Sequence, residues 1–314
     1  MPGYTGSIAV LAPIPSDALA PLRDRLNLVE VWRDPLGLLT SVPDRERIEI
    51  AFTIGNRPFT REIIELLPAL RFVCHFGIGT DQLDLATLRD RGVLVTNTAG
   101  ASASCVADLA VTMLLSLVRT LPQADAFVRH GDWSAKRFPY NASVGGRKVG
   151  IYGLGEIGVR IATRLAAFET EVAYHSRSPR AQVPYRHFSS LQALAEWSDD
   201  LVVAVSATSE TVGSVDRRVL TALGKGYVVN VARGSIVDED ALIEALQRGV
   251  IAGAGLDTFQ NEPVIRDEFL ELENVILSPH VGGGTARAIR NTTGIFLANL
   301  RRYLEGEEPQ NVVR

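Results

Sequence analysis

Short runs of β-branched and other apolar residues alternate with helix-length segments along the 314-residue chain. Several of these runs are apolar on both faces, for example residues 201–205 (LVVAV) and 227–231 (YVVNV). Such strands are typical of a parallel sheet that helices cover on both sides. Strands that alternate with helices form βαβ units. The sequence therefore predicts an α/β protein with doubly wound parallel sheets.

The predicted elements fall into two series. The first has strands at residues 7–11, 48–53, 72–75 and 93–96 and a helix at 81–91. The second has strands at 148–152, 171–174, 201–205, 227–231, 252–256 and 275–277 and helices at 156–168, 191–197, 215–222 and 239–248. Long helices at 101–120 and 286–304 connect the two series. We therefore predict two Rossmann- or flavodoxin-like domains, formed by residues 1–98 with 285–314 and by residues 99–284, with a ligand-binding cleft between them.

Composition narrows the classes of function. A net charge of −4, from 32 basic and 36 acidic residues, disfavours a nucleic-acid partner. Two cysteines, Cys74 and Cys105, are too few for a disulfide framework or a four-cysteine zinc site, and we expect no metal. The N-terminus lacks the basic region of a signal peptide, and the apolar stretch at 101–118 contains Asp108. We expect a cytoplasmic protein with no membrane partner.

A glycine motif follows the predicted strand at 148–152 and opens the next predicted helix. It reads G-x-G-x-x-G and consists of Gly153, Leu154, Gly155, Glu156, Ile157 and Gly158. Gly153 permits the tight turn, Gly155 lets a pyrophosphate approach the backbone, and Gly158 lets the helix pack close to the strand. The helix N-terminus then offers free N–H groups to phosphates. The motif predicts a dinucleotide site.

The residue that ends the next strand selects the cofactor. An NAD-binding site carries Asp or Glu there, which bonds the ribose hydroxyls. Here His175 occupies that position, 22 residues after the first glycine of the motif, and Ser176, Arg177, Ser178 and Arg180 follow it. Guanidinium and hydroxyl groups suit a 2′-phosphate. We therefore expect NADPH as the preferred cofactor, with NADH as the alternative.

Three further segments follow predicted parallel strands and carry polar side chains. They contain Arg233, Asp257 with Glu262, and His280. Reduction of a 2-oxo acid needs a cation for the substrate and a proton donor, roles that suit Arg233 and His280. Glu262, if bonded to His280, orients the imidazole and favours its charged form. Asp257 either bonds the nicotinamide carboxamide or helps to hold Arg233. Each residue alone is more often structural, and the hypothesis rests on their occurring together.

The segments GLGEIG, NVARGSIVDEDAL, GLDTFQNEP and SPHVGG resemble those of the D-isomer-specific 2-hydroxyacid dehydrogenase family, in order and spacing. VCHFGIGTDQLDL and VADLAVTMLLSLVR extend the resemblance over nearly the whole chain. The resemblance implies that Arg233, Glu262 and His280 are catalytic. It also implies a homodimer. The apolar segment at 101–118 fits either a subunit interface or the core of its own domain.

The resemblance also implies ligand contacts elsewhere. Backbone N–H groups of Gly77, Ile78 and Gly79 would bind the substrate carboxylate, and the loop of Ile54, Gly55 and Asn56 would form another wall of the pocket. Cofactor contacts would include Ser206, Thr208, Val231, Ala232, Asp257 and Gly282. Two positions depart from the family pattern, because Ala99 and Ser206 stand where many members have proline. The absence of Asp or Glu at position 175 is a third departure, and in this respect the chain resembles the reductases of the family that prefer NADPH.

We therefore predict NADPH-dependent reduction of a small 2-oxo acid, of the glyoxylate or hydroxypyruvate type, to the D-2-hydroxy acid. Two alternatives within the family are the reduction of an aryl pyruvate such as hydroxyphenylpyruvate and the reduction of 2-ketogluconate. An alternative from another class is a dinucleotide-sensing protein like the corepressors that share this fold. Such a sensor would bind cofactor tightly and reduce 2-oxo acids only slowly.

Overall fold

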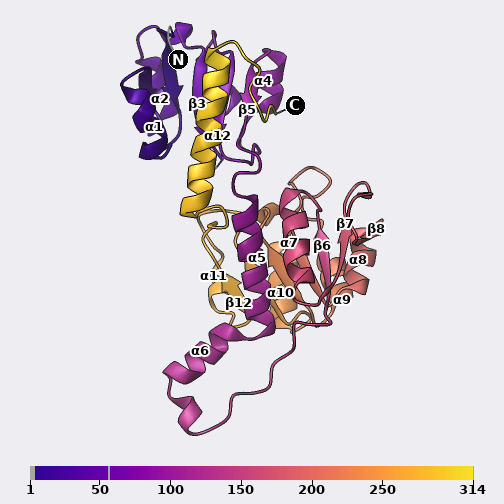
Figure 1. Cartoon of the computed structure of the whole chain (residues 1–314). Helices are drawn as coiled ribbons and strands as arrows, with labels where there is room; N and C mark the ends of the chain where they lie inside the picture. The colour runs from indigo at the N-terminus through magenta and orange to yellow at the C-terminus, as the bar shows by residue number, and fades with distance from the viewer. Residues whose placement is uncertain (1–3, 56, 314) are drawn as a thin grey trace. The chain divides into compact units, whose positions relative to one another are not determined.

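The structure is a computed structural model that describes residues 4–55 and 57–313. The chain divides into two compact units, Met1–Ser102 with Ala286–Arg314 and Ala103–Thr285. Each unit contains one sheet in which all strands run parallel (Figure 1). The predicted fold class, two parallel-sheet α/β domains, is confirmed.

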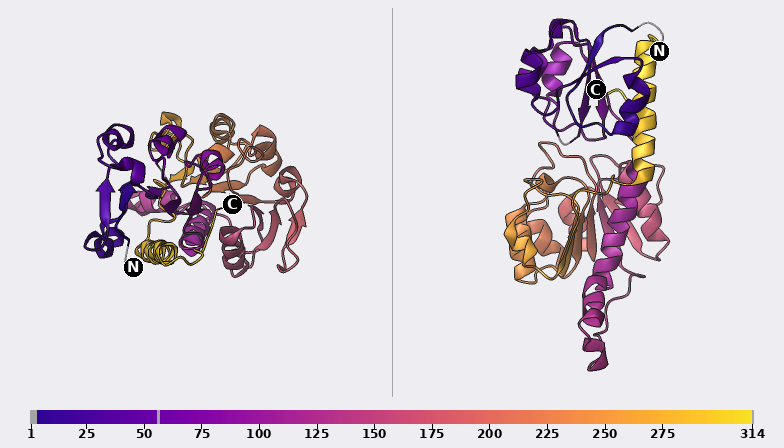
Figure 2. Two further views of the ribbon diagram at one scale, coloured as in Figure 1. Left: turned by 90° about the horizontal axis from the view of Figure 1, so that it is seen from above. Right: turned by 90° about the vertical axis from the view of Figure 1, so that its left-hand side faces the viewer.

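The first unit contains a five-stranded sheet in the order β2-β1-β3-β4-β5. Its strands are β1 (Ser7–Val10), β2 (Asn27–Glu30), β3 (Ile50–Ile54), β4 (Phe72–Phe76) and β5 (Leu94–Thr96). Its helices are α1 (Ser16–Arg23), α2 (Pro35–Thr40), α3 (Arg61–Glu65), α4 (Leu85–Asp90) and α12 (Ala286–Leu304). The last helix returns to this sheet from the far end of the chain, as Figure 2 shows.

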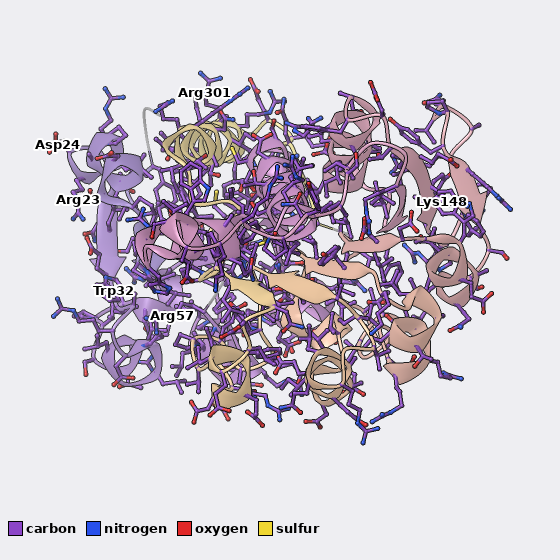
Figure 3. All side chains as sticks on the ribbon, turned by 90° about the horizontal axis from the view of Figure 1, so that it is seen from below. Arg23, Asp24, Trp32, Arg57, Lys148 and Arg301 are labelled. Atoms are coloured by element: carbon purple, nitrogen blue, oxygen red, sulfur yellow. The ribbon has the colours of Figure 1, made fainter. Side chains whose placement is uncertain are left out.

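Alternating side chains of these strands form two separate cores. Ile8 and Val10 of β1 pack with Phe296 of α12 on one face. Ala9 of β1 packs with Leu39 of α2 on the other face. Charged side chains of the helices project outward, as Arg23 and Arg301 show in Figure 3. This two-sided burial explains why the central strands are apolar on both faces.

The second unit contains a seven-stranded sheet in the order β12-β11-β10-β9-β6-β7-β8. Its strands are β6 (Lys148–Tyr152), β7 (Glu171–His175), β8 (Arg186–Phe188), β9 (Asp200–Val203), β10 (Tyr227–Asn230), β11 (Gly253–Leu256) and β12 (Val275–Leu277). Its helices are α5 (Ala103–Val118), α6 (Leu121–Arg129), α7 (Glu156–Ala166), α8 (Leu191–Trp197), α9 (Arg217–Leu223), α10 (Glu239–Gln247) and α11 (Asp267–Leu270).

The apolar helix α5 belongs to the core of this second unit. It packs with α7 on one face of the sheet, where Leu114 and Ile161 are buried, and helices α8 to α10 cover the other face. Among the described residues, no single helix is long and apolar enough to cross a membrane. Helices α5 and α6 pass that test only together, and they are bent by 61° at their junction.

Some element boundaries differ from those predicted. The helix expected at 81–91 begins at Leu85, because the Asp84 carboxylate accepts a hydrogen bond from Thr87 N at 3.0 Å and caps the first turn. Strands β2 and β8, which flank the sheets as edges, were not predicted at all. Both are short, and β2 exposes polar residues at each of its ends, so neither shows the apolar run of a central strand.

Candidate active site

A histidine and a glutamate lie together beyond the carboxyl ends of β11 and β12. His280 Nδ1 and Glu262 Oε2 are 2.7 Å apart, and Glu262 Oε1 accepts a hydrogen bond from Phe259 N at 3.0 Å. A carboxylate only accepts hydrogen bonds, so Nδ1 of His280 carries the proton that is shared with Glu262. The other ring nitrogen, Nε2, is then the one that remains for a ligand.

The loop that carries His280 is held from one buried carboxylate. Asp257 is 2% exposed and directly follows β11. Its Oδ1 accepts hydrogen bonds from Ser278 Oγ and Val281 N, and its Oδ2 accepts one from Gly282 N at 2.9 Å. Inside this loop His280 adopts a left-handed conformation with φ of 54°, which a β-carbon makes unfavourable. Asp257 therefore has a task that the sequence did not reveal, which is to fix the turn that presents His280.

The loop that carries Arg233 follows β10. Asn230 accepts a hydrogen bond from Ala232 N and donates one to Arg233 O, so its side chain shapes the turn. A Cβ atom on Gly234 would lie 1.9 Å from the carbonyl carbon of Phe259, so only glycine lets the two loops approach. Arg233 and Glu262 are thereby placed on neighbouring loops at the carboxyl edge of the sheet, where open α/β sheets bind ligands.

Two further hydrogen bonds join the segment that follows β10 to the loop that follows β11. Glu239, at the start of α10, is 5% exposed and accepts a hydrogen bond from Gln260 N at 2.8 Å. The Gln260 side chain in turn donates to Val237 O at 2.9 Å. Asn230, Ser278 and Glu239 were not predicted as parts of the site. Their sequence signal is that they lie inside the segments NVARGSIVDEDAL and SPHVGG, which also hold predicted residues.

The glycine motif has the geometry that a dinucleotide needs. Gly153 has φ of 95°, and a Cβ atom there would lie 2.6 Å from Val205 Cα. A Cβ atom on Gly158 would lie 2.0 Å from Gly153 O, so α7 packs closely onto the turn. At Gly155, by contrast, a Cβ atom would meet nothing within 4 Å. The open side of Gly155, at the N-terminus of α7, fits a pyrophosphate.

The other residues of the motif differ in exposure. Leu154 is buried, Ile157 is half-buried, and Glu156 is exposed in the first turn of α7. At the ends of β9 and β10 the predicted cofactor residues also differ. Val231 and Ala232 are buried, whereas Ser206 and Thr208 lie in a turn that the Thr211 side chain closes by bonding Ser206 O and Thr208 N.

The loop after β7 presents an unpaired arginine. His175, at the end of β7, is half-buried and its Nδ1 lies 2.9 Å from Phe188 O, so this ring is engaged with β8. Ser176 Oγ donates to Ser178 O. Arg177 is exposed, and no described residue forms a hydrogen bond or ion pair with its guanidinium. An exposed cation without a carboxylate beside it is suited to a phosphate.

In the first unit, the loop of residues 77–79 follows β4 and has all three carbonyl groups bonded. Gly77 O accepts from Thr98 N at 2.9 Å, Ile78 O from Asn97 Nδ2 at 2.9 Å, and Gly79 O lies 2.9 Å from His75 Nε2. Because a trans peptide points its N–H opposite to its C=O, these bonds turn the following N–H groups the other way. No described residue accepts from Ile78 N or Gly79 N.

A second loop adjoins these residues. Ile54 ends β3 and Gly55 follows it, and a Cβ atom on Gly55 would lie 3.6 Å from Gly79 O. The sequence also indicated Asn56 for this wall, but Asn56 lies outside the described residues. Within the described part of the chain, no group of three His, Cys, Asp or Glu residues is arranged to hold a metal ion.

The comparisons with known proteins agree with one another. The model of the D-isomer specific 2-hydroxyacid dehydrogenase, NAD binding domain, matches residues 111–282. A glyoxylate/hydroxypyruvate reductase of Arabidopsis thaliana is 43% identical over 256 residues, which cover 81% of this chain and 79% of that protein. A hydroxyphenylpyruvate reductase of Plectranthus scutellarioides is 36% identical over 301 residues, which cover 96% of each chain.

A solved structure shows the same fold over the whole chain. It is an NADPH-dependent glyoxylate/hydroxypyruvate reductase from Sinorhizobium meliloti in complex with NADP and malonate. The TM-score is 0.91 at 37% identity, and the match covers 99% of this chain and 97% of that one. From these matches and the site geometry, we conclude that the chain belongs to the D-isomer-specific 2-hydroxyacid dehydrogenase family.

Proposed function

We propose that the protein reduces a small 2-oxo acid, of the glyoxylate or hydroxypyruvate type, to the D-2-hydroxy acid with NADPH. The observation that carries this proposal is the His280–Glu262 pair at 2.7 Å, on a loop fixed by Asp257, beside the loop of Arg233. Reduction of a 2-oxo acid needs a cation for the substrate and a proton donor, and the guanidinium of Arg233 and a protonated imidazole at His280 suit these two roles. Relatives named as reductases of such acids support the assignment.

In the proposed reaction, bound NADPH supplies the hydride that reduces the keto carbon. Arg233 binds the substrate and polarises its carbonyl oxygen. His280, protonated on both nitrogens, donates the Nε2 proton to that oxygen as it becomes a hydroxyl. Glu262 keeps the Nδ1 proton and orients the ring. In the oxidative direction, neutral His280 takes the hydroxyl proton on Nε2. The backbone N–H groups of Ile78 and Gly79 would bind the substrate carboxylate. No described residue accepts a hydrogen bond from either of them.

We further propose that Arg177 favours NADPH over NADH by binding the 2′-phosphate. The Arg177→Ala variant should raise KM for NADPH about tenfold or more, the loss expected for one charge-assisted hydrogen bond. KM for NADH should change little, since NADH has no 2′-phosphate. Initial rates with each cofactor at saturating 2-oxo acid measure this difference.

Arg160 provides a matched control for the loss of one positive charge. It lies exposed on α7, in the same unit. The Arg160→Ala variant should change neither KM. Equal increases in the KM for NADPH and the KM for NADH in Arg177→Ala would contradict the proposed role. Arg177 would then contact a group that both cofactors contain, and not the 2′-phosphate.

A panel of 2-oxo acids tests the proposed substrate class. Initial rates with NADPH should be compared for glyoxylate, hydroxypyruvate, pyruvate, 2-ketogluconate, phenylpyruvate and 4-hydroxyphenylpyruvate. We expect the highest kcat/KM with glyoxylate or hydroxypyruvate, and chiral analysis of the product of hydroxypyruvate should show the D enantiomer. A higher value for an aryl pyruvate or for 2-ketogluconate would replace the proposed substrate within the same family.

We also propose that the protein forms a homodimer. The segment after α5 exposes large apolar side chains in the single chain, including Leu121, Val128, Trp133 and Tyr140. Exposed apolar groups of this kind gather at protein interfaces. Light scattering coupled to gel filtration should give twice the 34.0 kDa of one chain. A mass of one chain at micromolar concentration would contradict the dimer.

A further inference from the structure

His75 is a buried histidine on β4, next to the loop of residues 77–79. It is 1% exposed, and the pairing of β3 with β4 makes Thr53 its neighbour in register. Side chains alternate along a strand, so both residues share the face of the sheet on which Ala51 and Val73 form an apolar core. Two polar side chains at the end of an apolar face cost free energy unless they are hydrogen-bonded.

The contacts of the ring fix one tautomer. Nε2 lies 2.9 Å from Gly79 O and Nδ1 lies 2.8 Å from Thr53 Oγ1. A carbonyl oxygen only accepts hydrogen bonds, so Nε2 carries the proton. Burial lowers the pKa of His75 to about 4, so the ring is neutral near pH 7 and Nδ1 accepts from the Thr53 hydroxyl. Both nitrogens of the ring are therefore satisfied.

The same ring edge lies against both candidate substrate loops. A Cβ atom on Gly77 would lie 3.3 Å from Nε2, and one on Gly55 would lie 3.9 Å from it. Three hydrogen bonds hold the carbonyl groups of residues 77–79. Of these three, only the bond to Gly79 O comes from a side chain on a strand of the sheet, that of His75. Because the Gly79–Thr80 peptide is planar, holding its oxygen sets the direction of the Thr80 N–H and fixes the carboxyl end of the loop that carries the Ile78 and Gly79 amides.

We propose that His75 is a positioning residue, whose Nε2–H tautomer holds the 77–79 loop so that its amides face the carboxylate of the substrate. This inference rests on the proposed function, because it takes a 2-oxo acid as the ligand of the loop. Amides that are held in place bind an anion without first losing conformational freedom. A loop whose last carbonyl has no donor binds the same anion more weakly.

Two substitutions separate the hydrogen-bond donor from the bulk of the ring. His75→Gln keeps an N–H group near the position of Nε2 and retains a donor for Gly79 O. His75→Asn is too short to reach that carbonyl but retains a partner for Thr53. We expect His75→Asn to raise KM for the 2-oxo acid about tenfold or more with kcat nearly unchanged, since carboxylate binding contributes equally to the ground and transition states. His75→Gln should restore most of the loss.

Oxalate, a dicarboxylate that is not reduced, measures anion binding without turnover. The amide resonances of Ile78 and Gly79 should shift on titration with oxalate. We expect the dissociation constant to rise about tenfold or more in His75→Asn and to stay close to that of the unmodified protein in His75→Gln. NADPH affinity should be unchanged in both, because the glycine motif belongs to the other unit. Where His75→Asn does not fold, Thr53→Val removes the donor to Nδ1 and should weaken oxalate binding in the same direction.

The outcomes separate this inference from the proposed function. Unchanged oxalate binding in His75→Asn, or equal losses in the Asn and Gln variants, would overturn the positioning role. The positioning role would also be overturned if the amide resonances of Ile78 and Gly79 in the unmodified protein did not shift on titration with oxalate. A protein that binds oxalate with the expected variant pattern, yet reduces no 2-oxo acid, would refute the proposed function and leave the role of His75 supported.

Discussion

Replacing His280 with glutamine is expected to lower kcat for 2-oxo acid reduction by about 10²–10⁴-fold, the usual contribution of a general acid. Glutamine retains a hydrogen-bonding group but cannot be protonated, so it cannot deliver a proton to the carbonyl oxygen. The 2.7 Å contact between Nδ1 and Glu262 leaves only Nε2 for that delivery. The affinity for NADPH should be retained, because the glycine motif lies on a different loop from His280.

Steady-state kinetics and NADPH fluorescence titration measure the two quantities separately. His130→Gln is a matched control, since His130 is exposed at the end of α6. It should change neither kcat nor NADPH affinity. If His280→Gln lost NADPH binding and kept its kcat at saturating cofactor, His280 would be a cofactor ligand rather than the proton donor.

The second large effect concerns stability. Asp200, at the start of β9, has a fully buried carboxylate that Arg147 holds through two hydrogen bonds of 2.6 and 2.7 Å. Asp200 Oδ1 also accepts from Tyr227 N at 3.1 Å. Arg147→Met leaves this charge buried without a positively charged partner. We expect the free energy of unfolding to fall by about 3–5 kcal/mol, the usual cost of breaking a buried pair from one side.

This loss should depend on pH. Burial raises the pKa of Asp200 above its ordinary value, and Arg147 opposes that rise. Without Arg147 the pKa rises further, so the native state binds a proton that the unfolded state releases above about pH 4. A group with a raised native pKa destabilises progressively as the pH increases. The deficit of Arg147→Met should therefore be larger at pH 8 than at pH 4.

Differential scanning calorimetry at both pH values tests these expectations. Asp200→Asn added to Arg147→Met removes the charge and keeps an acceptor for Tyr227 N, so it should recover most of the loss. Arg218→Met, which breaks an exposed ion pair with Asp216, should have little effect. A loss in Arg147→Met that the second substitution does not relieve would mean that packing, and not the charge, is responsible.

The sequence predicted the elements whose signal is local. The turn at Gly153 and the start of α7 follow from three glycines after an apolar strand, and φ of 95° at Gly153 agrees with the tight turn expected there. The edge strand β2 was missed, because its four residues are half-buried or exposed and show no apolar run. Tertiary pairing with β1, which the sequence does not display, makes it a strand.

In the candidate site, too, the features with a local sequence signal were predictable, and those that depend on tertiary contacts were not. Glu262 and His280 were expected to meet, and they do. The use of the Asp257 carboxylate to hold the His280 turn depends on three groups from a later loop, which no local pattern reveals. His75 was not recognised, because a single histidine in an apolar strand is typical of a core position. The proposed role of His75 can be inferred only from two tertiary features. The strand register places Thr53 beside it, and the loop after β4 brings Gly79 O within hydrogen-bond distance of its Nε2.

The consumption of NADPH by the unmodified protein, with saturating glyoxylate or hydroxypyruvate, tests the central claim most directly. We expect kcat of about 1–10³ s⁻¹, as for ordinary enzymes, and a higher kcat/KM for NADPH than for NADH. Tight NADPH binding without turnover of either acid, or of the wider panel, would contradict that claim. The protein would then be a dinucleotide sensor built on a dehydrogenase fold.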